Sequence, residues 1–209
     1  MNFFESLKIF KKNSILKNKA EELISRLPNN ELVTKEILES LDNKTTKLVE
    51  DKDIKNNYYV YLNDTIYLSS NKKNTYARIC VIAHECIHSI QSKIVQKLNF
   101  ISSNIEIITF VIFSVLGLFM QESKMPLYIY SLIVALSLIF RLILEIDAVK
   151  KSVNVSDKYL NGKIIGKDKS FIIDIYKFQT KILMPLFLIN LIFPKLLRLI
   201  IMCTIYYIL

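Results

Sequence analysis

The sequence HECIH at residues 84–88 is an HExxH motif, the pattern of a zinc site on a helix. Four residues are slightly more than one helical turn, so His84 and His88 point to the same side and can bind one metal ion. Glu85 stands beside them, where it can take a proton from a zinc-bound water. Both histidines of the chain belong to the motif, which makes a chance match rare. The motif predicts a catalytic Zn²⁺ site with Glu85 as its general base.

A third protein ligand must complete this site, because a catalytic zinc ion takes three protein ligands and keeps one open position. The chain has no third histidine, so a cysteine or an acidic residue must serve. Cys80 precedes His84 by about one turn, Glu106 lies inside an apolar stretch, and Glu145 directly follows another. We favour Glu145, because it and Asp147 place two carboxylates within an apolar segment downstream of the motif. The two expected spans between His88 and Glu145 would also return both residues to the same side of the membrane. Cys80 and Glu106 remain alternatives.

Two further polar residues accompany Glu145. Asp147 diverges from Glu145 on a regular helix, so we expect it to accept a hydrogen bond from a ligand histidine rather than to bind the metal. Arg141 stands one turn before Glu145 and either balances the carboxylates or stabilises an oxyanion. Charge balance is the preferred role for Arg141.

Helices and a β-hairpin are expected to position the motif. The apolar spacing over residues 75–97 predicts one buried helix that carries it. Residues 58–62 and 65–69 are rich in strand formers around an Asn-Asp turn, which predicts a β-hairpin. Helices are also expected over residues 2–26 and 31–41.

The second half of the chain contains long apolar stretches. Residues 98–121 and 125–144 carry one charge each and are long enough to cross a membrane, so they predict a hairpin of two spans. Residues 182–209 are apolar but interrupted by two prolines, and form either one kinked span or two surface half-helices. The predicted fold is therefore a mainly α membrane protein with a helical head, a small β-hairpin, a transmembrane hairpin and C-terminal apolar helices.

This division gives four parts: a head at 1–97, the hairpin at 98–145, a polar segment at 146–181 and a membrane segment at 182–209. Eight lysines lie in 146–181, against one in the turn of the hairpin, so the positive-inside rule places the head in the cytoplasm. The net charge of +9 fits contact with membrane lipid, and no basic-aromatic motif indicates nucleic acid. Three cysteines without regular spacing fit reduced thiols, and no signal peptide is expected.

From about Tyr61 to Val153 the chain resembles the YugP-type neutral zinc metallopeptidases, bacterial membrane proteins of the gluzincin group. The family's HExGHAxQ stretch corresponds to residues 84–91, with Ile87 in place of the usual glycine, and its EFDA-like motif corresponds to residues 145–148. The resemblance implies His84, His88 and Glu145 as zinc ligands, Glu85 as catalytic base and a zincin-like head. In gluzincins a strand beside the active-site helix pairs with the substrate, and Tyr61–Ser69 is the candidate here.

The function expected is that of a multi-pass cell-membrane zinc endopeptidase. Its active site would face the cytoplasm and cut peptides or membrane proteins close to the bilayer. The alternatives are a non-catalytic zinc-binding scaffold and a basic membrane interaction protein with an accidental motif. A di-iron oxidase is excluded, because such enzymes need more histidines than this chain has.

Overall fold

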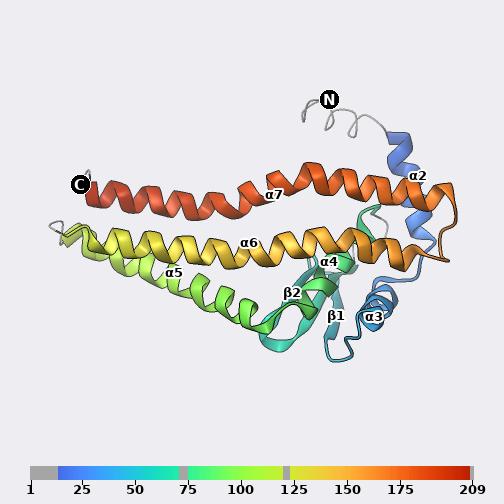
Figure 1. Cartoon of the computed structure of the whole chain (residues 1–209), viewed down its shortest axis with the longest axis horizontal. Helices are drawn as coiled ribbons and strands as arrows, with labels where there is room; N and C mark the ends of the chain where they lie inside the picture. The colour runs from blue at the N-terminus through green and yellow to red at the C-terminus, as the bar shows by residue number, and fades with distance from the viewer. Residues whose placement is uncertain (1–13, 71–74, 120–122, 208–209) are drawn as a thin grey trace. The chain divides into compact units, whose positions relative to one another are not determined.

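The chain is mostly helical, with one small sheet, in a computed structural model that describes residues 14–70, 75–119 and 123–207 (Figure 1). The first half of the helix expected at 2–26 lies outside these residues, and its second half forms α2. The elements are α2 (Ser14–Ser25), α3 (Asn30–Ser40), β1 (Lys47–Asp51), β2 (Tyr58–Val60), the short 3-10 helix η1 (Tyr61–Asn63), β3 (Thr65–Ser69), α4 (Arg78–Ile90), α5 (Lys93–Phe119), α6 (Met125–Leu160) and α7 (Lys167–Tyr207).

Two compact units divide the chain, and α6 and α7 each contribute to both. The first unit comprises Met1–Gln91 and Asp147–Met184. The second comprises Ser92–Ile146 and Pro185–Leu209. The boundary in α6 falls inside a continuous helix, so Glu145 precedes the first unit's stretch of α6 by two residues.

The sheet of the first unit has three strands in the order β1-β3-β2. The expected antiparallel pairing of β2 and β3 is confirmed, although η1 replaces the end of the first predicted strand. Strand β1, which the sequence did not reveal, pairs parallel with β3. Asp64 adopts a left-handed conformation after η1, and its carboxylate accepts hydrogen bonds from Thr46 and Tyr59 (3.0 and 2.8 Å). These bonds hold the start of β1 beside the β2–β3 connection.

Helix α4 lies in the core of the first unit. One face of the helix is fully buried against the sheet, against α3 and against the parts of α6 and α7 that belong to this unit, whereas Val81 and Ile90 are exposed. Each buried isoleucine or leucine stabilises the fold by about 1.5–3 kcal/mol relative to an exposed one. The main members of this core are Ile79, Ile82, Ala83, Cys86, Ile87, Ile66, Leu68, Val33, Ile37, Ala148, Leu160, Ile172 and Tyr176.

The prediction of a single helix over 75–97 is wrong, because the helix is interrupted at Gln91. Helix α4 ends at Ile90, and Gln91 has an extended backbone (φ −67°, ψ 161°). The carbonyl of Ser92 accepts the Gln96 N–H at 3.1 Å, which starts the first turn of α5. Serine favours helix starts, which supports a new helix at this position.

The second unit consists of α5 and the parts of α6 and α7 that pack on it. Helices α5, α6 and α7 are each long and apolar enough to cross a membrane, which indicates a membrane protein. A small core centres on Tyr130 and Met202, whereas many large apolar side chains on the outside are exposed. Such an exterior suits lipid rather than water.

The C-terminal apolar region does not form the two half-helices that were one of the two expectations for it. It is the continuation of α7, which runs through Pro185 and Pro194 without a break. The polar segment expected at 146–181 is likewise helical, except at the turn between α6 and α7. Gly162 and Gly166 supply the positive φ angles of this turn (76° and 62°).

Candidate metal centre

Helix α4 brings the two histidines of the motif together. The Nε2 atoms of His84 and His88 lie 3.0 Å apart, and both rings are half-buried. Two nitrogens that bind one tetrahedral zinc ion at about 2.05 Å are about 3.3 Å apart. The pair therefore needs only a small adjustment to hold one ion between its ring nitrogens.

Glu145 supplies the carboxylate of the same group. The ligand atoms of His84, His88 and Glu145 all lie within 4.8 Å of one another. Glu145 is 3% exposed, so its charge needs a partner. Two imidazole nitrogens and one carboxylate oxygen form a donor set that zinc accepts in catalytic sites. The residues present thus fit a metal ion, and their chemistry is compatible with zinc.

Gln91 fixes the orientation of His88. The Nδ1 atom of His88 lies 2.8 Å from Gln91 Oε1, and Gln91 Nε2 donates to Asp147 Oδ2 at 3.0 Å. An amide oxygen can only accept, so Nδ1 must carry the proton and the neutral ring keeps its lone pair on Nε2. That lone pair is the one directed toward His84. The amide of Gln91 therefore prepares His88 as a metal ligand.

Asp147 reaches the histidine through Gln91. Its other oxygen, Oδ1, pairs with Lys151 at 2.8 Å. The direct bond expected between Asp147 and a ligand histidine is replaced in the structure by this relay through the amide. Sequence reasoning missed Gln91, although its position one turn after His88 was the available signal.

Arg141 pairs with Glu145 along α6. Its Nη2 lies 2.6 Å from Glu145 Oε1, and the Arg141 side chain is 45% exposed. A carboxylate has two oxygens, so Oε1 can remain with Arg141 while Oε2 serves a metal ion. The geometry suits charge balance, the preferred role for Arg141.

Glu85 lies on α4 directly after the first ligand histidine. It is 7% exposed, which is unusual for a carboxylate. Burial, and next the charge of Glu85, raise the pKa of the neighbouring Cys86 thiol. This thiol therefore stays protonated at neutral pH and behaves as a small apolar side chain.

Neither alternative third ligand joins the metal group. The Sγ of Cys80 lies 3.5 Å from the hydroxyl of Ser152, and burial raises the pKa of this thiol. Glu106 is bound to Lys195 and Arg198 within the second unit. Among the described residues, the His, Cys, Asp and Glu side chains that can hold a metal ion are those of His84, His88 and Glu145.

Polar contacts hold α4 at both ends. Near its start, the Arg78 guanidinium donates to the carbonyl of Pro28, and burial lowers the pKa of Arg78. Near its end, Asn43 Nδ2 donates to Ser89 Oγ at 2.8 Å. These contacts and the surrounding core fix the helix that carries both histidines.

The strand expected to bind substrate is buried inside the sheet. β3 has β1 on one side and β2 on the other, so it cannot pair with a peptide. The prediction for Tyr61–Ser69 is therefore wrong. The free edges of the sheet belong to β1 and β2.

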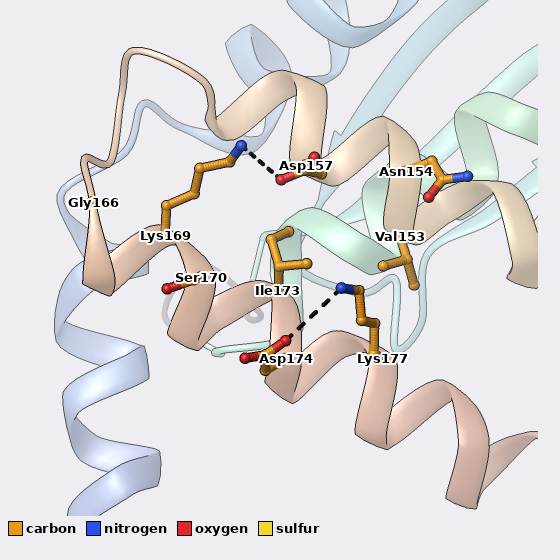
Figure 2. Close-up of a pocket in the computed structure, with 9 residues that line it drawn as sticks. All are labelled: Val153, Asn154, Asp157, Gly166, Lys169, Ser170, Ile173, Asp174 and Lys177. Carbon is orange, nitrogen blue, oxygen red and sulfur yellow. Dashed lines mark ion pairs between the residues drawn. The ribbon is translucent and has the colours of Figure 1, made fainter.

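A separate hollow of about 320 Å³ lies between the end of α6 and the start of α7 (Figure 2). Its charged side chains pair with one another: Lys169 with Asp157 at 2.7 Å, and Lys177 with Asp174 at 3.9 Å. None of the motif residues lines this hollow. It is distinct from the metal group.

No protein-family model matches the chain, and neither a curated protein nor a solved structure matches it. The case for function rests on the residues of the site.

Proposed function

We propose that the chain is a membrane-anchored zinc endopeptidase of the YugP-type, gluzincin kind. The observation that carries the proposal is the group of His84, His88 and Glu145, with Glu85 inside the HExxH sequence. When bound, zinc supplies a Lewis acid that polarises the scissile carbonyl and acidifies an attacking water. A helix that presents both histidines beside a small sheet is compatible with a zincin-like head.

The chain's own residues perform the proton transfers and the positioning. Glu85 accepts a proton from the attacking water and passes it to the leaving amine. Asp147 and Gln91 hold the His88 ring in its ligand tautomer. Arg141 balances the charge of Glu145.

The substrates proposed are membrane proteins or peptides near the bilayer. Helix α4 ends three residues before the start of α5, the first candidate span. Glu145 stands on α6, the second candidate span. Both connections favour a metal centre close to the membrane surface. The lysines around the α6–α7 turn favour the cytoplasmic side of a cell membrane.

Metal content of the full-length, detergent-purified protein tests the site. We expect about one zinc per wild-type chain and a strong loss in Glu145→Ala. The matched control is Asp157→Ala, which removes another α6 carboxylate, one that pairs with Lys169 at 2.7 Å and should leave zinc in place. Wild-type protein without zinc, under conditions that preserve other zinc proteins, would refute the proposal.

Cleavage of peptides tests catalysis. Glu85→Gln should keep zinc and lose about 10²–10⁴-fold in rate, because it cannot act as a base. Glu36→Gln is the matched control, because Glu36 is a half-buried carboxylate on α3 that pairs with Lys163 and lies outside the metal group. If zinc-loaded wild type cuts neither soluble nor membrane-tethered peptides, the peptidase proposal is refuted, and the non-catalytic zinc-binding scaffold becomes the better explanation. Equal cleavage of soluble and tethered versions would refute the membrane-proximal substrate.

A further inference from the structure

A second charged group is buried inside the second unit, apart from the metal centre. Glu106 on α5 is 1% exposed and forms ion pairs with two basic side chains of α7. Lys195 Nζ lies 2.7 Å from Glu106 Oε2. Arg198 binds both oxygens, with Nε at 2.7 Å from Oε1 and Nη2 at 3.0 Å from Oε2. We call Glu106, Lys195 and Arg198 the charged cluster.

Helix α6 contributes polar groups to the charged cluster. The Tyr130 hydroxyl donates to Glu106 Oε1 at 3.0 Å. Lys195 Nζ also donates to Ser137 Oγ at 2.7 Å, and Ser137 is fully buried. All three helices of the second unit therefore meet at this point.

The charged cluster lies deep within the apolar length of each helix. At about 1.5 Å per residue, Glu106 is about 20 Å from Phe119 along α5. By the same measure, Ser137 is about 18 Å from Met125, and Lys195 about 18 Å from Tyr207. The distance from the helix end to the charged cluster is therefore nearly the same in all three helices. In a hydrocarbon layer about 30 Å thick, this depth is near the middle.

The charges in the cluster do not cancel. Two cations face one carboxylate, and both oxygens of that carboxylate are already engaged. The excess positive charge reaches the outside at Arg198, whose side chain is 26% exposed, against 11% for Lys195. The bonds to Glu106 use two of the five N–H donors of Arg198, and the Tyr130 hydroxyl also interacts with the guanidinium. The donors that remain can bind a second carboxylate. Exposed apolar residues, Leu197 and Ile201, lie beside it on α7.

We infer that the charged cluster binds an acidic side chain in the transmembrane helix of a partner protein. Lipid phosphates lie at the bilayer surface, too far from this depth. A second copy of this chain does not supply the acid, since Glu106 is already paired here and Glu145 pairs with Arg141. The fitting partner is an apolar helix with one Asp or Glu near its centre, which provides the missing negative charge. The inference rests on the proposed membrane insertion of these helices and does not depend on hydrolysis.

Peptide binding in vesicles tests the inference. The full chain, with a dye on a C-terminal tag, is reconstituted in phosphatidylcholine vesicles. Energy transfer then measures its association with a polyleucine transmembrane peptide that carries one central Asp, and with the Asn twin. We expect the Asp peptide to bind at least about tenfold more tightly, as suits a charge-assisted pair.

Two variants should abolish this preference. Arg198→Gln removes the excess charge and leaves Glu106 bonded to Lys195 and Tyr130. Ser137→Asp keeps Arg198 but places a carboxylate next to Lys195 within the chain. A preference that persists in both variants would show that the Asp is recognised elsewhere, and would overturn the inference.

The remaining outcomes separate the inference from membrane insertion. Inserted wild-type protein that binds both peptides equally overturns the inference alone, because the cluster then needs no outside acid. Protein that carbonate removes from the vesicles overturns insertion and the inference together. Loss of the preference in both variants, with wild type inserted, supports the partner site.

Discussion

Gln91 provides the sharpest test of the metal centre, because it touches both a ligand and an acidic residue without being able to bind zinc strongly itself. Its amide joins His88 Nδ1 and Asp147 Oδ2 at 2.8 and 3.0 Å. Gln91→Ala removes both bonds and leaves His84, His88 and Glu145 unchanged. We expect weaker zinc binding with the three ligands intact.

The size of the effect follows from what replaces the amide. Partners of metal-binding histidines typically contribute about 10- to 100-fold in metal affinity. The His88 ring is half-buried, so water can reach Nδ1 once the side chain at 91 is truncated. This replacement favours the lower end, about tenfold, or about 1.4 kcal/mol.

Competition with a fluorescent zinc chelator measures the effect, with protein in detergent at constant neutral pH. Lys151→Met is the matched control. It removes the other partner of Asp147, at 2.8 Å, but not the Gln91 bridge. An exposed ion pair contributes at most about 1 kcal/mol, so the zinc affinity of the control should stay close to that of wild type. If Gln91→Ala binds zinc as tightly as wild type with an unchanged circular dichroism spectrum, the tautomer argument is refuted.

Three further predictions concern other parts of the chain. Glu106→Gln should lower the free energy of unfolding by about 3 kcal/mol in mixed micelles, because it leaves Lys195 buried without its counter-ion; an unchanged denaturation midpoint would contradict this. Gly117→Ala should lower the thermal midpoint, since an added Cβ would lie 2.6 Å from Ile205 Cγ2 and the strain of about 1–3 kcal/mol exceeds the helix-propensity gain of about 1 kcal/mol. Cys80→Ala should retain full zinc content by metal analysis, and the native thiol should react slowly with iodoacetamide by mass spectrometry, because burial raises its pKa; loss of zinc would restore Cys80 as a ligand.

The sequence was most informative where the spacing of the metal-binding residues matches one turn of a helix. The HExxH spacing alone places His84 and His88 together, because one helical turn decides their separation. The juxtaposition with Glu145 was also predictable, since two apolar stretches that form a hairpin bring the chain back toward the helix that carries the motif. The bond from Gln91 to Asp147 was not, because it joins residues 56 positions apart in the chain.

Other elements depended on tertiary context. Strand β1 has a charged sequence with alternating exposure, and it forms because β3 offers an edge for pairing. Prolines at 185 and 194 suggested interruptions, yet α7 passes through both. Neighbouring helices can satisfy the backbone groups that proline frees inside an apolar environment. Such effects of partners are invisible in a local pattern.

The order of the metal ligands along the chain has a consequence for biosynthesis. His84 and His88 leave the ribosome before α5 and α6 exist, whereas Glu145 follows most of the apolar hairpin. The nascent head therefore has two ligands and no third until the hairpin has been made. If the chain is the peptidase proposed above, its head has an incomplete metal site, and so no activity, until the segment that carries Glu145 has been made. Synthesis itself would then protect soluble proteins from the newly made enzyme.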